Sequence, residues 1–297
     1  MTLSAAGPLF SGSSIDRSDH IRNDPERLRK VMLPSARLLK LDGLAPVLDA
    51  DNRLIWGALS EAPGDAELVF LGMRDGMAHV AMVPQAGDPD PAYAHRRIWE
   101  AIGLLQPEDL ATYGTARSLV DWHARHRFCA VCGHTTRPAK GGWQRDCSNG
   151  DCAASHFPRT DPVAIMLVEH EGRLLLGRGL NFPERRYSAL AGFVEPGESI
   201  EECVAREVEE ESGIRVRDVK YIASQPWPFP SQLMLGCHAM AINEDITRDE
   251  TELADIDWFT KDEIEAALAG DHEDNAFIAP PAQAIAHYML RWWVAQQ

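Results

Sequence analysis

The chain has 297 residues, of which 45 are acidic and 29 are basic, so its formal net charge is −16. A charge of this sign repels phosphate backbones and argues against broad nucleic-acid binding. No apolar run approaches the roughly 20 residues that a membrane-spanning helix requires, so we expect no membrane partner. The length leaves room for two domains and a smaller module.

The first 120 residues show no pattern that indicates chemistry. Leu44–Val83 reads as several short strands separated by Gly and Asp-Asn turns, and a helical stretch is expected from Asp90 toward Leu105. We therefore expect an N-terminal α+β domain over residues 1–122, whose role is packing or the formation of a homodimer.

Four cysteines follow in two close pairs, Cys129-x2-Cys132 and Cys147-x4-Cys152. Such pairs can surround a tetrahedral Zn²⁺, and four thiolates leave no open position for a reacting molecule, so this ion would be structural. The alternatives are disulfides or unrelated buried cysteines. The start of the chain lacks the basic residues and the long apolar stretch of a secretory signal, which argues against disulfides and indicates a cytoplasmic protein. We expect a zinc module over residues 123–157.

The remaining residues, 158–297, alternate strand and helix signals. A continuous apolar run at Val163–Val168 predicts a buried central strand, and Arg173–Leu176 follows a turn as its hairpin partner. The later signals are two further strands and a last helix, expected at Val219–Ser224, at Leu233–Ala241 and from Pro280 to Trp293. This succession predicts an α/β fold.

The segment from Gly192 to Ile214 has the spacing G-x5-E-x7-R-E-V-x-E-E-x-G-I. Within it, Ser199 and Glu202 form a capping box, so a helix should begin there. The helix should end where Gly213 can take a left-handed conformation.

This helix would present two distinct faces. One carries three carboxylates that share a side of the helix and repel one another: Glu207, Glu210 and Glu211. The other is an apolar stripe that recurs every fourth residue and would anchor the helix to a core: Ile200, Val204 and Val208. The acidic face therefore needs a cation.

A nearby arginine supplies only part of that charge. Arg206 can reach Glu202 or Glu210 and hold them in place. A solvated acidic face is the simple alternative, but such a face requires neither Gly192 nor the separate Glu198 on the preceding loop. A hard divalent ion, in contrast, needs several oxygens from different backbone segments. The pattern therefore predicts a divalent-metal site.

The same segment resembles the Nudix box, which marks hydrolases that cleave a nucleoside diphosphate linked to another group. The resemblance implies that Glu207 and Glu211 bind Mg²⁺ or Mn²⁺, and that Glu198 and Glu210 act as further ligands, as supporting groups or as the base. It also implies a metal-directed backbone oxygen at Ala191 and a further metal-binding carboxylate at Glu252. Such an ion would neutralise phosphate charge and lower the pKa of a bound water.

Three prolines alternate with two aromatic residues in Ser224–Pro230. Such a stiff, extended ledge could stack a planar ring without losing much entropy. The alternative is a connector whose Trp and Phe fill a core. The string resembles the SQPWPFPxS motif of the NADH pyrophosphatase branch of Nudix hydrolases, with Gln where the motif usually ends in Ser. The resemblance implies substrate contacts at Gln225, Pro226, Trp227, Pro228, Phe229, Pro230, Ser231 and Gln232.

Two more positions match substrate contacts of that branch. Phe157-Pro158-Arg159 resembles its YPR segment, with Phe157 in place of the usual Tyr, which implies stacking on a base. The alternative is a strand lead-in stiffened by proline. Ala286, in the expected last helix, matches a second substrate contact.

The resemblances together imply a Nudix α/β/α sandwich with a mixed sheet, preceded by a four-cysteine zinc ribbon and an N-terminal Nudix-like domain. The implied activity is the metal-dependent hydrolysis of the pyrophosphate of NADH, and less well of NAD⁺, to a nicotinamide mononucleotide and AMP. One alternative is removal of the NAD cap from RNA 5′ ends by the same site. Another is a nucleotide-sensing regulator whose zinc ribbon contacts DNA.

Overall fold

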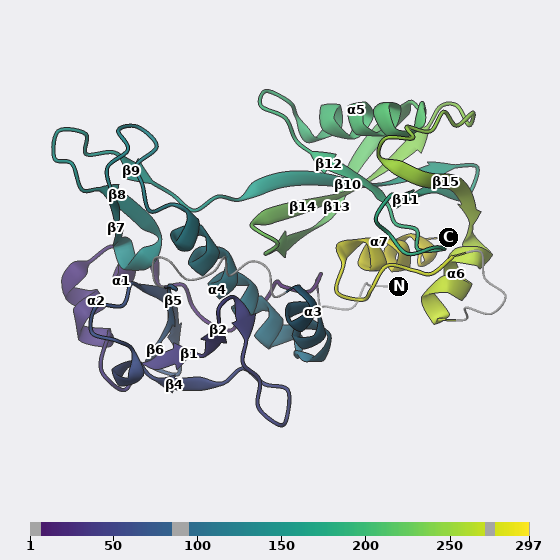
Figure 1. Ribbon diagram of the computed structural model, residues 1–297. Coiled ribbons are helices and arrows are strands. Elements are labelled where there is room, and N and C mark those ends of the chain that lie inside the picture. The colour runs from purple at the N-terminus through teal and green to yellow at the C-terminus, as the bar shows by residue number, and fades with distance from the viewer. Residues whose placement is uncertain (1–6, 85–94, 271–276, 297) are drawn as a thin grey trace. The chain divides into compact units, whose positions relative to one another are not determined.

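The computed structural model describes residues 7–84, 95–270 and 277–296, and it divides the chain into two compact units (Figure 1). The first unit consists mainly of Asp161–Pro226 and Gln232–Gln297. The second consists of Phe10–Thr160 and the short segment Trp227–Ser231, although strands of the first unit flank that segment on both sides.

The first unit is a mixed sheet between two layers of helices, which confirms the expected α/β/α sandwich. Its strands are β10 (Asp161–His170), β11 (Arg173–Gly179), β12 (Leu190–Phe193), β13 (Val216–Trp227), β14 (Gln232–Ala241) and β15 (Leu253–Thr260). Its helices are α5 (Ile200–Ser212), α6 (Lys261–Ala269) and α7 (Ile285–Val294). The strand order is β13-β14-β10-β11-β15, with β12 paired to β10. Strand β10 is parallel to β14 and antiparallel to β11 and β12.

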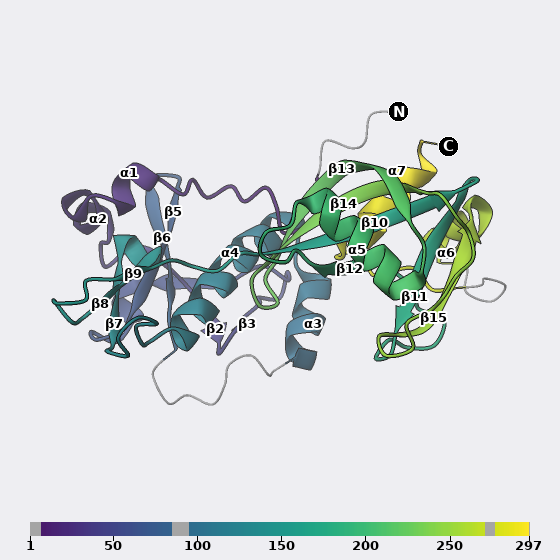
Figure 2. The ribbon, with the colours of Figure 1, turned by 90° about the horizontal axis from the view of Figure 1, so that it is seen from above.

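The central strand β10 is apolar and buried from Val163 to Val168, because helices cover both of its faces there. Ile165 and Leu167 enter the core on the side of α6 and α7, whereas Ala164, Met166 and Val168 enter the core beneath α5. Figures 1 and 2 show these helices on opposite faces of the sheet. Full burial of a side chain as large as Ile, Leu or Met contributes about 1.5–3 kcal/mol to the free energy of folding. The prediction of a buried central strand is confirmed.

Helix α5 also forms where its sequence predicts. The Ser199 hydroxyl accepts a hydrogen bond from the Glu202 amide at 3.2 Å, and the Glu202 carboxylate accepts one from the Ser199 amide at 2.7 Å. Gly213 ends the helix with a φ of 70°. The predicted apolar stripe lies in the core beneath the helix: Ile200, Val204 and Val208. This anchoring fixes which side of α5 carries the carboxylates.

The last helix begins later than predicted. Helix α7 begins at Ile285 and not at Pro280, because residues 281–284 form a turn and Ala284 keeps an extended backbone, with φ −85° and ψ 140°. Gln225 Oε1 accepts a hydrogen bond from the Ile285 amide at 2.8 Å and so satisfies a donor of the first helical turn. The start of α7 therefore depends on a side chain of β13.

The second unit has an α+β architecture, as expected for the N-terminal part. Its helices are α1 (Asp19–Arg22), α2 (Pro25–Val31), α3 (His95–Leu104) and α4 (Pro107–Arg125). Its strands are β1 (Arg37–Leu39), β2 (Leu41–Asp42), β3 (Ala45–Pro46), β4 (Trp56–Ala58), β5 (Leu68–Arg74), β6 (Met77–Met82), β7 (Thr136–Ala139), β8 (Gln144–Cys147) and β9 (Ser155–His156). The predicted start of a helix at Asp90 lies outside the described residues.

The cysteine-containing ribbon β7-β8-β9 is joined to the rest of the second unit by a buried arginine. Arg145 on β8 is 1% exposed. Its Nη1 donates to Glu67 Oε2 at 2.9 Å and to His123 Nδ1 at 2.8 Å. Burial lowers the pKa of His123 to about 4, so its ring is neutral and can accept this bond. These contacts hold β8 against α4. No helix in the described part of the chain is long and apolar enough to cross a bilayer.

Candidate functional site

The carboxylates of α5 meet the strand β12 at Gly192. A Cβ atom on Gly192 would lie 1.8 Å from Glu207 Cδ and about 2 Å from both of its carboxylate oxygens, 2.0 and 2.1 Å. The Glu207 carboxylate therefore occupies the space that any larger residue would fill. The fixed spacing between the glycine and the glutamate places one carboxylate directly on the strand.

Arg206 holds three of the predicted carboxylates. Its Nε donates to Glu198 at 2.6 Å, and its Nη1 donates to Glu207 at 2.8 Å and to Glu210 at 3.0 Å. The hydrogen bond from Arg206 lowers the pKa of Glu198 to about 2. Of the two partners predicted for Arg206, only Glu210 is observed, because Glu202 is used in the capping box. One guanidinium thus joins the loop carboxylate to the helix.

Glu211, the third of the carboxylates predicted on this face of α5, is the most buried of them. It is 5% exposed. Burial is the main cause that raises its pKa to about 8, and the charges of Glu207, Glu252 and Asp249 add to the effect. Burial also raises the pKa of Glu207, with further contributions from Glu210 and Glu252, although Arg206 opposes the shift. Ionising this group of acids together requires a cation beyond Arg206.

The donor set fits a hard divalent ion. It consists of carboxylate oxygens from α5, from the preceding loop and from the segment before β15, where Glu252 is exposed. Ala191, next to Gly192 on β12, is exposed as well. Mg²⁺ and Mn²⁺ prefer such oxygen ligands. Arg206 thus links Glu198, Glu207 and Glu210, and the charges of Glu207, Glu210 and Glu252 act on the buried Glu211.

The four cysteines of the ribbon form a zinc site. Their sulfur atoms all lie within 4.8 Å of one another, with Cys129 Sγ 3.8 Å from Cys152 Sγ and Cys132 Sγ 3.4 Å from Cys147 Sγ. This arrangement suits a tetrahedral ion with Zn–S distances of about 2.3 Å. His156 Nε2 lies 3.3 Å from Cys129 Sγ. All four ligands come from the protein, so the zinc is structural.

The aromatic segment that begins at the last residue of β13 is packed within the second unit. Trp227 and Phe229 contact each other and also Phe10 and Trp99, with ring centroids 4.8–6.0 Å apart. Arg117, which is 3% exposed, donates to the Pro228 carbonyl, and its guanidinium lies 4.6 Å from the Phe229 centroid. The segment is therefore rigid, but neighbouring side chains engage both rings.

The other predicted substrate residues lie in different environments. Gln225 is 1% exposed, and its amide nitrogen donates to the carbonyls of Leu9 and Gln283. Ala286 is 1% exposed within the core between the sheet and α7, whereas Phe157 is 63% exposed. Pro226 and Pro230 are exposed, Pro228 and Ser231 are buried, and Gln232 is half-buried. Only some of these side chains present surface to a ligand.

Comparison with known proteins decides the family. A NUDIX domain model matches residues 158–279, an NADH pyrophosphatase zinc ribbon domain matches 124–157, and an NADH pyrophosphatase-like rudimentary NUDIX domain matches 35–122. A Mycobacterium bovis protein named NAD-capped RNA hydrolase NudC is 41% identical over 304 residues, covering 97% of this chain and 95% of that protein. The chain belongs to the NADH pyrophosphatase family of Nudix hydrolases.

Two other similar proteins match smaller parts of this chain. Human NAD-capped RNA hydrolase NUDT12 is 43% identical over 202 residues, which is 65% of this chain and 44% of that protein. A crystal structure of a Nudix hydrolase from Nitrosomonas europaea aligns with a TM-score of 0.45 and 23% identity, covering 58% of this chain and 92% of that one.

Two residues at the site of this family member were not identified from the sequence. Asp249 influences the pKa of Glu211, and its amide donates to the Glu211 carbonyl at 3.0 Å. Phe193 follows Gly192 directly and is 54% exposed, while its carbonyl accepts a hydrogen bond from Arg206 at 3.0 Å. An exposed ring at this position can stack on a base. The only sequence signal was the proximity of each residue to the Nudix motif or to Glu252.

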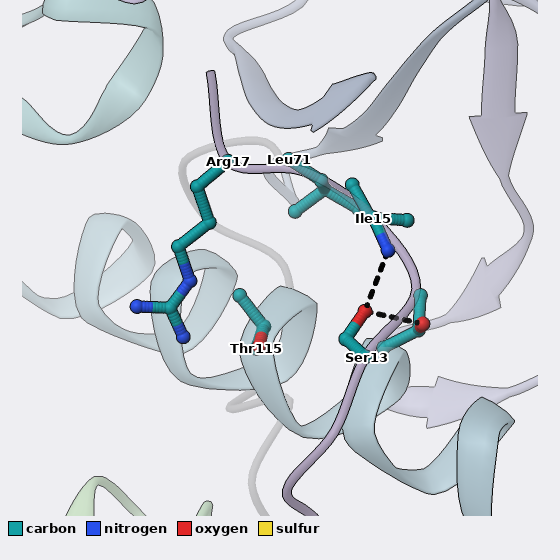
Figure 3. Close-up of a pocket in the computed structure, with 6 residues that line it drawn as sticks. Ser13, Ile15, Arg17, Leu71 and Thr115 are labelled. Atoms are coloured by element: carbon teal, nitrogen blue, oxygen red, sulfur yellow. Dashed lines mark hydrogen bonds between the residues drawn. The ribbon is translucent and has the colours of Figure 1, made fainter. Parts of the chain in front are cut away.

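A small cavity in the second unit carries no such chemistry. Its lining residues are Ser13, Ile15, Arg17, Leu71, Thr112 and Thr115 (Figure 3). The Ser13 hydroxyl lies 3.0 Å from the Thr112 hydroxyl and accepts a hydrogen bond from the Ile15 amide at 3.3 Å. Arg17 is the sole ionisable side chain among these lining residues, so the cavity has no carboxylate, imidazole or thiol with which to act on a substrate.

Proposed function

We propose that the protein hydrolyses the pyrophosphate bond of NADH, and less well that of NAD⁺, to a nicotinamide mononucleotide and AMP. The observation that carries the proposal is the carboxylate group assembled around Glu207 on Gly192, with Arg206 as its fixed cation. Such a group suits a divalent ion over a phosphoanhydride better than it suits a solvated helix face. Family membership supports a diphosphatase acting on a nicotinamide dinucleotide.

The proposed ligands of Mg²⁺ or Mn²⁺ are Glu207, Glu211, Glu252 and the backbone oxygen of Ala191. When bound, the ion would neutralise phosphate charge and lower the pKa of a water. Arg206 keeps Glu198 and Glu210 pointed toward the same region, so either carboxylate can accept the proton of the attacking water. The burial of Glu211 keeps solvent from one side of the group. The main role of the protein in this proposal is to position the carboxylates and Arg206 around the ion and the pyrophosphate.

The central experiment compares two glutamates of α5. Glu207→Gln should reduce NADH turnover by several orders of magnitude and leave the melting temperature nearly unchanged. Glu209→Gln is the matched control, because Glu209 is exposed on the same helix, and it should retain activity. Full activity in Glu207→Gln would refute the metal assignment. Absence of NADH turnover in the wild-type protein would instead favour the nucleotide-sensing regulator, which has no use for an intact carboxylate set.

Removal of the NAD cap from RNA 5′ ends is a second candidate activity of the same site. Relatives that cover nearly the whole chain carry the name NAD-capped RNA hydrolase. The net charge of −16 disfavours contact with a long RNA but not with a short 5′ end. Turnover of NADH, NAD⁺ and an NAD-capped oligonucleotide, each with Mg²⁺ and with Mn²⁺, separates the two activities and identifies the preferred ion.

The proposal extends to the remaining substrate contacts. Phe157 would stack on a base, and the segment from Gln225 to Gln232, with its exposed Pro226 and Pro230 and its half-buried rings, would form one wall for the substrate. Ala286 and Gln225 would act indirectly, since both are buried and support α7. Phe157→Ala, assayed for the Michaelis constant of NADH, tests the stacking role.

We also propose that the protein is a cytoplasmic homodimer with three parts, residues 1–122, 123–157 and 158–297. The bounds of the family models support this division. None of the six cysteines forms a disulfide, which suits a reducing compartment. Phe128 and Val131 are 67% and 74% exposed and offer apolar surface to a second copy. Sedimentation analysis of the purified protein tests the dimer.

A further inference from the structure

The loop between β11 and β12 presents two large apolar side chains to solvent. Leu180 is 54% exposed and Phe182 is 45% exposed. Neither residue belongs to a motif or to the proposed metal site. Two large apolar side chains exposed two residues apart on one loop of an otherwise acidic domain need an explanation.

The loop is held by backbone hydrogen bonds at its base and near its end. Gly177 and Ser188 exchange two backbone hydrogen bonds of 2.9 Å and so close the loop at its base. The Phe182 amide donates to the Gly179 carbonyl at 3.0 Å, and its ring lies 3.9 Å from the place of a Cβ on Gly179. Near the end of the loop, the Arg185 carbonyl accepts from the Ile278 amide. A ring that is held in place loses little entropy when a ligand stacks on it.

A local irregularity directs this loop toward the carboxylates. The pairing of β11 with β15 shifts between Arg178 and Gly179, which is a β-bulge that re-aims the following residues. As a result, the Leu180 amide donates to the Glu252 carbonyl at 3.2 Å. The Glu252 charge in turn acts on Glu207 and Glu211. Leu180 is therefore a direct neighbour of the group proposed to bind the metal.

The charge of the loop also suits a nucleotide. Residues 178–186 contain three arginines and one glutamate, in a chain whose net charge is −16. An aromatic ring among basic residues is the usual platform for a base that carries phosphate. A dinucleotide has two rings, and the exposed Phe193, next to Gly192 on β12, offers a surface for one of them.

We propose that Leu180 and Phe182 form a platform for one base of the dinucleotide whose pyrophosphate lies over the carboxylates. This inference rests on the proposed function and names a binding surface for its substrate. The Phe182 ring stacks on the base, and Leu180 covers its edge beside Glu252. The platform makes no contact with the reacting atoms, so it acts on substrate affinity.

The test uses Phe182→Ala, Leu180→Ala and the double variant. Stacking on one base is worth about 1–3 kcal/mol, so the Michaelis constant for NADH should rise about fivefold to a hundredfold in the double variant. The rate at saturation should change little. Tyr221→Ala is the matched control, because Tyr221 is 60% exposed on β13, an edge strand that β14 and β10 separate from β11. Its kinetic constants should equal those of the wild type.

A second substrate shows whether adenine or nicotinamide lies on the platform. ADP-ribose contains adenine but no nicotinamide, so equal losses with NADH and ADP-ribose place adenine on the platform. A loss with NADH alone places nicotinamide there. Unchanged Michaelis constants for both substrates in the double variant overturn the inference.

Binding measured without turnover separates this inference from the proposed activity. In the Glu207→Gln background, NADH fluorescence gives a dissociation constant that should rise when the double variant is added. If the wild-type protein hydrolyses no dinucleotide, the proposed function fails. The fluorescence titration then still decides whether the platform binds the base, and an unchanged dissociation constant overturns the platform.

Discussion

Replacing Gly192 with alanine tests how closely the strand and the carboxylate of Glu207 fit together. The added Cβ would lie 1.8 Å from Glu207 Cδ. Non-bonded carbon atoms normally approach to about 3.5–4.0 Å, so the carboxylate must move by roughly 2 Å. A misplacement of about 1 Å can cost a hundredfold in rate. We expect kcat/KM for NADH to fall by at least about a hundredfold in Gly192→Ala.

The fold should survive this change, because the displaced group is the end of a flexible side chain. Overpacking typically costs about 1–3 kcal/mol, and we expect the low end of that range. Gly64→Ala is the matched control: a Cβ at Gly64 meets no atom within 4 Å. The control should keep wild-type turnover. Thermal unfolding and Mn²⁺ titration of both variants separate lost stability from lost metal binding.

A double variant sharpens the test. Glu207→Asp shortens the side chain and withdraws the carboxylate from the strand, so adding Gly192→Ala to it should cost far less than adding it to the wild type. Residues in contact show such non-additive effects. If Gly192→Ala keeps wild-type activity and Mn²⁺ affinity, the position of the Glu207 carboxylate does not govern catalysis and the reasoning fails.

Three other perturbations have defined outcomes. The pKa of Glu211 is raised to about 8 in the folded protein, above the ordinary carboxyl range. The free energy of unfolding without metal should therefore fall as the pH rises from about 4.5 to 8. Glu211→Gln should remove this pH dependence, as measured by thermal unfolding. Cys147→Ser should release the zinc, measured with a chromophoric chelator, and lower the melting temperature. Arg145→Ala should cost about 1.5–3 kcal/mol in denaturant unfolding because it removes the charge-assisted hydrogen bonds from Arg145 to Glu67 and leaves only Arg127 to pair with that carboxylate. Exposed Arg137→Ala should stay within about 0.5 kcal/mol.

Features encoded over a few residues could be predicted from the sequence. The capping box at Ser199 and the left-handed residue Gly213 set both ends of α5, because caps act within one turn. The zinc site could be predicted because its four cysteines stand in two close pairs along the chain. The Nudix spacing also predicted the carboxylate group, since helix geometry places residues three and four apart on one face.

Features that depend on long-range contacts could not be predicted in this way. Gln225 satisfies the amide of Ile285, and no local pattern around either residue signals that bond. The start of α7 was misplaced for this reason. Arg145 looks like any surface arginine until Glu67 and His123, both distant in sequence, are brought against it. Residues whose partners lie far along the chain have environments that the sequence alone does not specify.

The arrangement around Arg206 explains why the carboxylates can exist together before an ion binds. Its guanidinium neutralises part of the charge of Glu198, Glu207 and Glu210 and fixes their positions, but it does not contact Glu211. Glu211 is buried beside other negative charges, and its pKa is raised because ionising it there is unfavourable. A divalent ion removes this repulsion, so metal binding and ionisation of Glu211 should be linked. Proton release on Mn²⁺ addition should therefore be measurable near pH 7 and absent in Glu211→Gln.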